Sequence, residues 1–121
     1  MWIFDWKEGA WSGPIEVKSD VIPEPRSFHQ LTAVGDLIYC FGGCGENGRL
    51  NDLHVFDTNT ACWTRLPTCD QMAGRGGACF AASASGTSLY VVAGFDGQET
   101  KDMYRYDIST QVWTKLNDFP E

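Results

Sequence analysis

The chain has 121 residues, which fits one domain or part of one, and 43% of them are hydrophobic, enough for a packed core. Its formal net charge of -7 at pH 7 opposes contact with nucleic acid or anionic membranes, and its five cysteines, an odd number without CxxC spacing, favour reduced thiols over disulfides. We expect a cytoplasmic or nuclear protein without a nucleic-acid or membrane partner, since the N-terminus lacks the pattern of a signal peptide and no apolar run is long enough to cross a membrane.

The chain begins with a short segment that recurs later in the sequence. Phe4-Asp5 is followed by Trp11, six residues after the Asp, and the aromatic-Asp pairs at 56–57 and 106–107 are each followed by a Trp at the same distance. A recurrence of this kind indicates an internal repeat. Residues 1–15 are therefore predicted to be the second half of a preceding unit.

Two complete units follow, and each is predicted to contain four short strands. The evidence is a series of β-branched or aromatic runs bounded by Gly, Asn, Asp and Pro, with no sustained helical period. A longer loop is expected between the second and third strands of each unit. Asp57 and Asp107 are expected to close tight turns by accepting hydrogen bonds from backbone N–H groups two or three residues on. The predicted strands are 28–34, 37–43, 52–56 and 62–66 in the first unit, and 78–84, 88–94, 102–106 and 112–116 in the second.

The two units match each other along most of their length. Residues 51–66 fall on 101–116 at an offset of 50, and residues 38–43 fall on 89–94 at an offset of 51. The strands therefore keep their pattern while the loops vary in length. Four-stranded units repeated about every 50 residues are typical of a β-propeller, in which each blade buries its faces on its neighbours.

Three repeated features resemble the kelch family of propeller proteins: the glycine doublet Gly42-Gly43 after an apolar strand, the pair Phe56-Asp57, and Trp63 six residues after that Asp. Ala93 replaces the first glycine in the second unit. The resemblance implies an all-β fold, a kelch-type β-propeller segment of about two and a half four-stranded blades, with the glycines allowing close approach of the next blade and the Trp between blades. The chain then divides into the second half of a preceding blade (1–15), kelch repeats at 25–66 and 74–116, and the start of the next linker (117–121).

Within that family, three segments look like parts of the plant nitrile-specifier and epithiospecifier proteins: Pro25–His29, Gly74–Ala78 and Ala93–Gly97. Those proteins use ferrous iron to divert glucosinolate breakdown toward nitriles or related products. The resemblance implies that Arg26 would hold the sulfate of the aglucone, for which a guanidinium fork is suited. The Glu-x3-Asp-x3-His run that resembles the iron ligands of that group does not occur here, so no cofactor is expected within this segment, and Fe(II) belongs to this alternative only.

The candidate binding residues lie in loops predicted at one end of the blades, where function usually resides. Arg26 and Arg75 precede the first strand of each repeat, where they either face the mouth of the central channel or pair with carboxylates of neighbouring blades. His29 and His54 are either packed, hydrogen-bonded histidines or a general base or metal ligand, and no metal site is predicted. The loops between the second and third strands supply the other candidates, which are Glu46, Asn47, Arg49, Asp96, Gln98 and Lys101.

Two functions remain open from the sequence. The first is a kelch propeller module that binds or scaffolds a protein or peptide partner on the loop face. The alternative is a specifier-like protein, an Fe(II)-dependent lyase acting on sulfated thiohydroximates. Propellers usually close with four to eight blades. The chain therefore needs further blades, and we expect a fragment of a longer chain rather than copies that assemble one ring or a partner chain that completes it.

Overall fold

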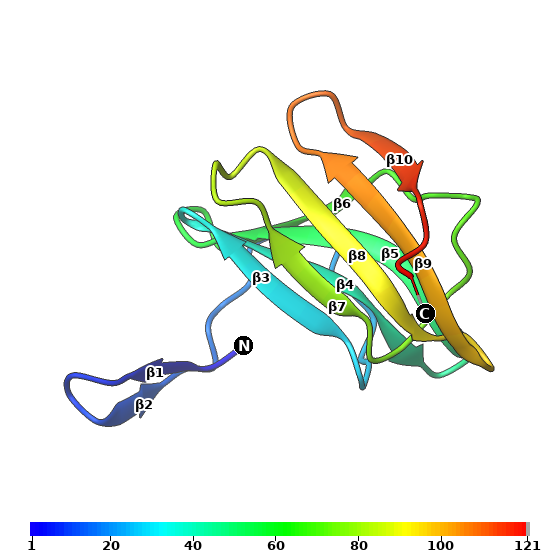
Figure 1. The fold of residues 1–121 in the computed structure, drawn as a ribbon. Coiled ribbons are helices and arrows are strands. Elements are labelled where there is room, and N and C mark those ends of the chain that lie inside the picture. Colours follow the sequence, from blue (N-terminus) through cyan, green and yellow to red (C-terminus); the bar gives the residue numbers. More distant parts are fainter. Residues whose placement is uncertain (121) are drawn as a thin grey trace.

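The structure, a computed structural model, describes residues 1–120 and is built from strands, turns and loops (Figure 1). Glu121, the last residue of the predicted linker 117–121, lies outside the described residues. Nothing in residues 1–120 forms a helix that could cross a membrane. The predicted all-β fold is confirmed. The strands of the described part are β1 (Ile3–Asp5), β2 (Ala10–Ser12), β3 (Gln30–Val34), β4 (Leu37–Gly45), β5 (Gly48–Asp57), β6 (Cys62–Leu66), β7 (Cys79–Ala82), β8 (Ser88–Phe95), β9 (Glu99–Asp107) and β10 (Val112–Leu116).

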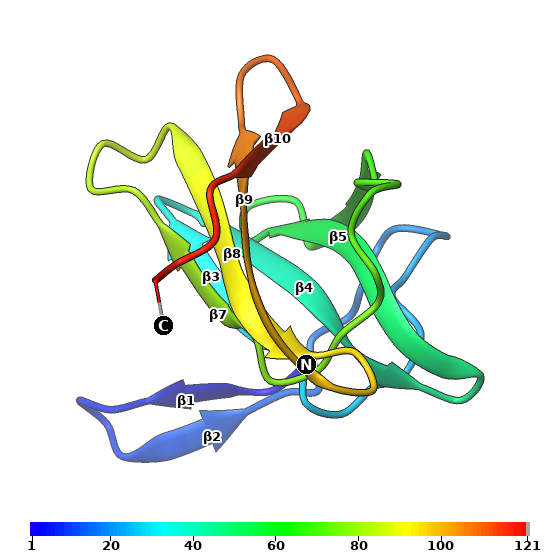
Figure 2. The same ribbon diagram turned by 45° about the vertical axis from the view of Figure 1, so that its right-hand side comes forward.

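Two four-stranded antiparallel sheets form the body of the molecule, and a two-stranded hairpin lies apart from them (Figures 1 and 2). The first sheet, which we call blade 1, has the order β3-β4-β5-β6, and blade 2 has the order β7-β8-β9-β10. Each strand therefore pairs with its neighbour in the sequence. The hairpin consists of β1 and β2. This arrangement is that of two adjacent propeller blades preceded by part of another.

A cross-strand aromatic pair occupies the same place in the hairpin and in both blades. Each pair joins the strand before an Asp-led turn to the strand after it, and packed aromatic pairs of this kind stabilise a sheet. The hairpin therefore corresponds to the third and fourth strands of a blade. The pairs, with their ring-centroid separations, are Phe4–Trp11 at 5.1 Å, Phe56–Trp63 at 5.1 Å and Tyr106–Trp113 at 5.0 Å.

The turn that follows each third strand is closed by its Asp, as predicted. Asp57 Oδ1 accepts hydrogen bonds from the backbone N–H groups of Asn59 at 2.8 Å and Thr60 at 3.3 Å. Asp107 Oδ1 accepts one from the backbone N–H of Thr110 at 2.9 Å. This bond lowers the pKa of the Asp107 carboxyl. The carboxylate thus satisfies backbone donors that the turn leaves without a strand partner.

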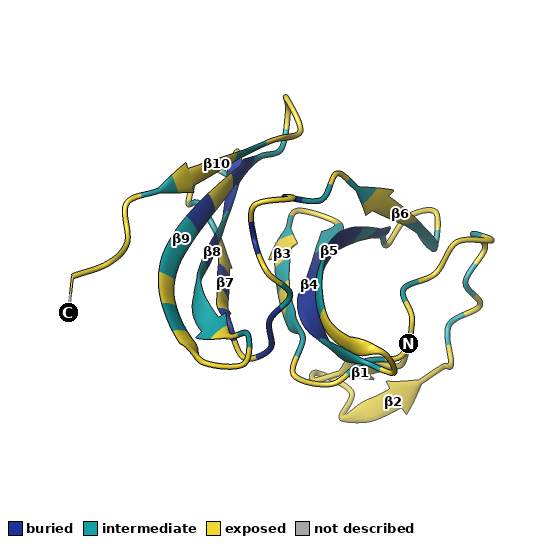
Figure 3. Ribbon diagram, turned by 90° about the vertical axis from the view of Figure 1, so that its right-hand side faces the viewer, coloured by how far each residue is buried: buried dark blue, intermediate teal, exposed yellow. Residues whose placement is uncertain are grey.

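The hydrophobic core lies between the two blades (Figure 3). Strands β3 and β7 run side by side, and the linker between the blades contributes buried residues. Trp113 spans the junction, because its indole N–H donates to the Pro67 carbonyl at 2.7 Å while its ring lies 6.3 Å from that of Phe41. The expected place of the Trp between blades is confirmed at this junction. The core includes Tyr39, Phe41, Leu53, Met72, Phe80, Leu89, Val91, Tyr104 and Tyr106.

The hairpin between the second and third strands is longer, and its loop shorter, than predicted. In blade 1 the strands pair as far as a two-residue turn at 46–47, and in blade 2 as far as a three-residue turn at 96–98. Gly42 and Gly43 have φ of 59° and 100°, and the register shifts there, so the doublet forms a bulge after which pairing resumes. The expectation of a longer loop is wrong because it treats the doublet as the end of the strand.

The first strand of each blade starts later than predicted, at Gln30 rather than 28 and at Cys79 rather than 78. In blade 1 the reason is local, because Phe28 has a φ of 56°, which lies outside the β region of regular strand pairing. Continuous pairing of β3 with β4 therefore begins at Gln30, opposite Phe41.

Candidate functional site

Arg75 links the two blades, and its side chain is only 1% exposed. Its backbone belongs to blade 1: the N–H donates to the Leu50 carbonyl at 2.9 Å, and the carbonyl accepts from the Gly43 N–H at 2.8 Å. Its side chain belongs to blade 2, where Nη1 and Nη2 donate to the two oxygens of Asp102 at 2.5 and 3.0 Å. Nη1 also donates to the Ala93 carbonyl at 3.1 Å. One residue thus ties one blade to the next.

Arg26 makes the equivalent side-chain contacts in blade 1. Its Nη1 and Nη2 donate to the two oxygens of Asp52 at 2.7 and 2.9 Å, and Nη1 also donates to the Gly42 carbonyl at 3.1 Å. Its Nε donates to the Glu24 carbonyl at 3.1 Å. Both arginines therefore pair with carboxylates, with the correction that each carboxylate lies in the arginine's own sequence repeat, 25–66 or 74–116, and not in a neighbouring one. A role of either arginine in binding a partner stays a prediction.

The two carboxylates of these pairs favour the ionised form. Burial alone would raise the pKa of Asp52, but hydrogen bonds from His54 and Arg26 outweigh it and hold the pKa well below its ordinary value. Burial would likewise raise the pKa of Asp102, and the hydrogen bond and charge of Arg75 lower it. Because a buried charge without its partner is costly, each pair is stable only when both members are present.

The linker between the two blades, which contains Arg75, approaches blade 1 closely at the glycine doublet. A Cβ on Gly42 would lie 2.9 Å from the Arg75 carbonyl oxygen and 3.1 Å from that of Leu50. Ala93 stands at the equivalent place in blade 2 and has nearly the same φ, 55° against 59°. That conformation is unfavourable for any residue with a Cβ. Ala93 is therefore strained where Gly42 is not.

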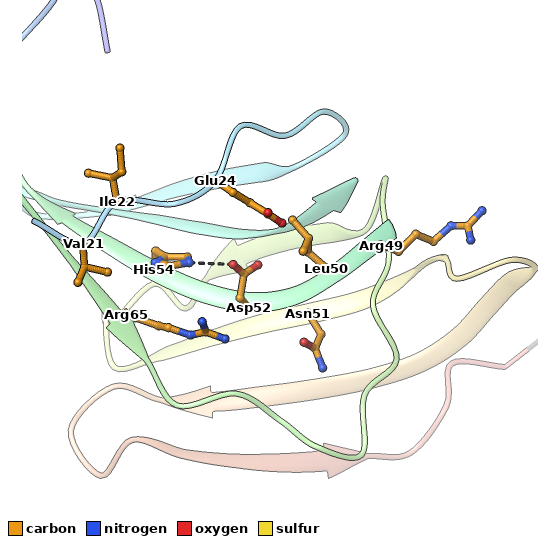
Figure 4. A pocket seen from close by; sticks show the side chains of 9 residues that line it. All are labelled: Val21, Ile22, Glu24, Arg49, Leu50, Asn51, Asp52, His54 and Arg65. Carbon is orange, nitrogen blue, oxygen red and sulfur yellow. Dashed lines mark hydrogen bonds and ion pairs between the residues drawn. The ribbon is translucent and has the colours of Figure 1, made fainter. Parts of the chain in front are cut away.

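A polar pocket on blade 1 contains the histidine of β5 (Figure 4). His54 Nε2 lies 2.8 Å from Asp52 Oδ2, and Arg65 is the cross-strand partner of His54. The linker at 21–24 forms one side of the pocket. His54 Nδ1 is buried and has no hydrogen-bond partner among the described residues. Within residues 1–120 no group of three or more His, Cys, Asp or Glu side chains comes together as a metal site.

The other predicted site residues lie on two neighbouring hairpins. Glu46 and Asn47 are in the β4–β5 turn, Asp96 and Gln98 are in the β8–β9 turn, and all four are exposed or half-buried. Lys101 is exposed on β9. Arg49, near the start of β5, reaches from blade 1 to blade 2, where its guanidinium carbon lies 5.0 Å from the ring centroid of Phe95. The structure therefore brings this predicted residue against an aromatic side chain of the next blade.

A hollow lies beside Arg49 at the junction of the two blades, and we call it the aromatic hollow. Two of its walls are large exposed side chains, Phe28 at 72% exposed and Phe95 at 45%. Its floor is tight: a Cβ on Gly76 would lie 3.1 Å from the Phe28 Cβ and 3.3 Å from the Cys44 Sγ. The residues that line the hollow are Phe28, Cys44, Arg49, Gly76, Gly77 and Phe95.

The two aromatic walls are absent from the residues that the sequence predicted. A signal for one of them is present, because Phe28 falls on Gly77 at an offset of 49 and both have positive φ, 56° and 63°. A large residue at a position that the sister repeat fills with glycine is unexpected for a scaffold. Phe95 falls on Cys44 at an offset of 51, and its contact with Arg49 crosses between blades, which a comparison of repeats cannot reveal.

The adjacent four-stranded sheets, the arginine that ties one blade to the next and the glycine bulges define a segment of a β-propeller. A family model described as the KLHDC2/KLHL20/DRC7 Kelch-repeats domain matches residues 1–120. The chain therefore belongs to the kelch-repeat family, and the family predicted from the sequence is confirmed.

Several characterised proteins are similar to this chain over most of its length. N-(sulfonatooxy)prop-2-enimidothioate sulfolyase of Thlaspi arvense is 36% identical over 117 residues, which are 94% of this chain and 33% of that protein. Kelch domain-containing protein 2 of Bos taurus is 33% identical over 118 residues, 95% of this chain and 28% of that protein. Host cell factor 1 of Homo sapiens is 33% identical over 114 residues, 92% of this chain and 5% of that protein.

The plant relative bears directly on the second resemblance. Its name describes a lyase acting on a sulfated thiohydroximate, the substrate class attached above to the specifier proteins, so that resemblance is confirmed. The chain spans a third or less of the length of these relatives.

Proposed function

We propose that this chain is part of a protein-interaction propeller and that a partner protein inserts an apolar side chain into the aromatic hollow. The observation that carries the proposal is Phe28, which combines a positive φ with a largely exposed aromatic side chain. Both features oppose stability in a residue with a large side chain, whereas Gly77, at the same position of blade 2, adopts its φ of 63° without strain and has no side chain to expose. Strained residues of this kind cluster at functional sites.

The chemistry of the hollow suits a protein partner. Exposed aromatic and arginine side chains are enriched where proteins bind each other, because they offer large contact areas with few rotatable bonds. Phe28 and Phe95 come from different blades, so a side chain between them would contact both. Kelch domain-containing and host cell factor relatives support an interaction role in general. Further blades, expected from a longer chain, would extend the same face.

The test is selection of peptides from a phage-displayed library of random linear sequences on the 121-residue chain. Pools are counter-selected on Phe28→Gly, which places at this position the residue that blade 2 already has. The counter-selection removes peptides that bind the exposed faces of the hairpin and of blade 1. We expect enriched peptides to bind the parent chain at least about tenfold more tightly than Phe28→Gly. If every peptide enriched on the parent chain is lost in the counter-selection because it also binds Phe28→Gly, the proposal is contradicted.

A second candidate function is the specifier-like activity, favoured by the 36% identity to the plant sulfolyase. Two observations count against this segment as its active centre. The guanidinium of Arg26 is already engaged by Asp52, Gly42 and Glu24. No ligand set for iron comes together in the described part of the chain, so these residues do not fit the metal.

Sulfate binding at Arg26 can be tested without removing the side chain. Under this second proposal, millimolar sulfate shifts the Nε–H resonance of Arg26 in a ¹⁵N correlation spectrum more than that of Arg75, the matched arginine of blade 2. Equal or absent shifts at the two arginines would contradict sulfate binding at Arg26.

A further inference from the structure

We infer that the partner segment carries a carboxylate close to the apolar side chain that enters the aromatic hollow. This inference rests on the proposed function and specifies the chemistry of the partner. Arg49 is the charged residue of the lining, and its placement carries the inference.

Arg49 is held at the hollow by two contacts. It lies opposite Cys44 in the β4–β5 register, which places both on the face that borders the hollow. Its guanidinium lies over the Phe95 ring at 5.0 Å, and a stacked guanidinium keeps the N–H groups at its edge available for an acceptor. The three ion pairs found among residues 1–120 involve Arg26, Arg75 and His54, so Arg49 is in none of them.

The remaining surface of the hollow selects the sign of the partner's charge. Two phenylalanine rings, a thiol and glycine backbone line it, so the lining's only charge, within the described part of the chain, is positive. Aromatic faces can also attract a cation, but Arg49 already covers the face of Phe95 and would repel a second positive charge. An acidic group that pairs with the fork of Arg49 therefore complements the rim better than a neutral or basic one.

The positive charge is not a requirement of the scaffold. Arg49 falls on Glu99 at the offset of 50, so the equivalent position of blade 2 bears the opposite charge on the same hairpin. Both residues are exposed. A position whose charge reverses between two repeats of one fold is free to serve recognition, which a repeated arginine such as Arg75 is not.

The test compares the amino-acid composition of peptide pools selected from the same random library on three proteins: the parent chain, Arg49→Gln and Lys115→Gln. Lys115 is an exposed cation on β10, outside the hollow, so its variant makes the same change in net charge and controls for long-range attraction. Pools from the parent and from Lys115→Gln should be enriched about tenfold over the starting library in Asp or Glu within two positions of an aromatic or aliphatic residue. The Arg49→Gln pool should keep the apolar residue and lose the acidic one. Thermal unfolding of the three proteins checks that all are folded.

The possible outcomes separate the two proposals. Acidic residues enriched equally on Arg49→Gln, or absent from the parent pool, would overturn the inference and leave the proposed function standing. Peptides whose binding survives Phe28→Gly would overturn the proposed function, and the inference with it. An enriched peptide in which Glu→Gln weakens binding to the parent but not to Arg49→Gln would support both.

Discussion

The two complete blades share a scaffold and differ at its rim. Both have the aromatic pair, the Asp-led turn and the buried Arg–Asp pair in the same register. They differ where the aromatic hollow forms: Phe28 in blade 1 stands where blade 2 has Gly77, and Arg49 stands where blade 2 has Glu99. The positions that repeat are those on which packing between blades depends. The positions that differ are therefore the better place to look for recognition.

The largest effect is expected where a repeated residue spans the blade junction. Trp113→Ala should lower the free energy of unfolding by about 3–5 kcal/mol, because removal of this large aromatic side chain would leave a cavity between the blades. Trp11→Ala, the equivalent change in the hairpin, should cost much less because Trp11 is 67% exposed. Urea denaturation of both variants provides the comparison. Equal losses would show that the hairpin is as well packed as the blades.

The next effect concerns the buried ion pair of blade 2. Asp102→Ala should destabilise the protein by about 3–5 kcal/mol, because it leaves the enclosed guanidinium of Arg75 without its carboxylate. Asp96→Ala, in the β8–β9 turn of the same blade and outside the buried ion pair, should change stability by less than about 0.5 kcal/mol. Thermal and urea unfolding measure both. A small loss for Asp102→Ala would contradict the role of Arg75 as the link between blades.

A smaller effect should appear in the pH dependence of stability. The folded pKa of Asp52 and of Asp102 is lowered. Each therefore stabilises the fold above an unfolded pKa of about 3.9, and this contribution is lost as pH falls through the folded value. At pH values below about 4, the urea concentration at the midpoint of unfolding should decrease as the pH is lowered. Asp52→Asn should make this decrease smaller. A parent midpoint that does not change down to pH 3 would contradict the shifted pKa values.

The smallest change should be a gain. Ala93→Gly should stabilise the protein by up to about 1 kcal/mol, because glycine adopts the φ of 55° without strain. Gly42→Ala is the reciprocal change, and it should destabilise because its Cβ would lie 2.9 Å from the Arg75 carbonyl oxygen. Differential scanning calorimetry of both variants checks the signs. A stabilising Gly42→Ala would mean that the linker is not held against the doublet.

Much of the fold could be predicted from the sequence because the signals are local and repeated. The spacing of Asp57 and Trp63 recurs in each unit, and the structure places every copy in one register. The extent of the β4–β5 hairpin could not be predicted. Glycine usually marks a loop, whereas here the glycine doublet forms a bulge through which the strand continues. The same limit applies to the start of β3, which depends on the φ of Phe28.

The candidate site could be predicted only in part. Arg49 is predicted in the loop between the second and third strands, but the structure places it on β5, and its aromatic neighbour Phe95 is 46 residues away in the sequence. Arg26 and Arg75 are predicted as equivalent residues, yet whether such a residue faces solvent or a carboxylate depends on Asp52 and Asp102 in strands that the sequence alone does not bring together. The positions of these arginine side chains are determined by contacts between separate strands, which local sequence patterns do not reveal.

One stability measurement tests most directly whether the residues that differ between the blades lie outside the scaffold. It is the urea unfolding of Phe28→Gly beside the parent chain. We predict that the variant is as stable as the parent or more stable by up to about 1 kcal/mol. Glycine adopts the positive φ at this position without strain, and the substitution removes an exposed aromatic ring. A loss of more than about 1 kcal/mol would mean that Phe28 supports the fold, and it would contradict the assignment of the aromatic hollow to recognition.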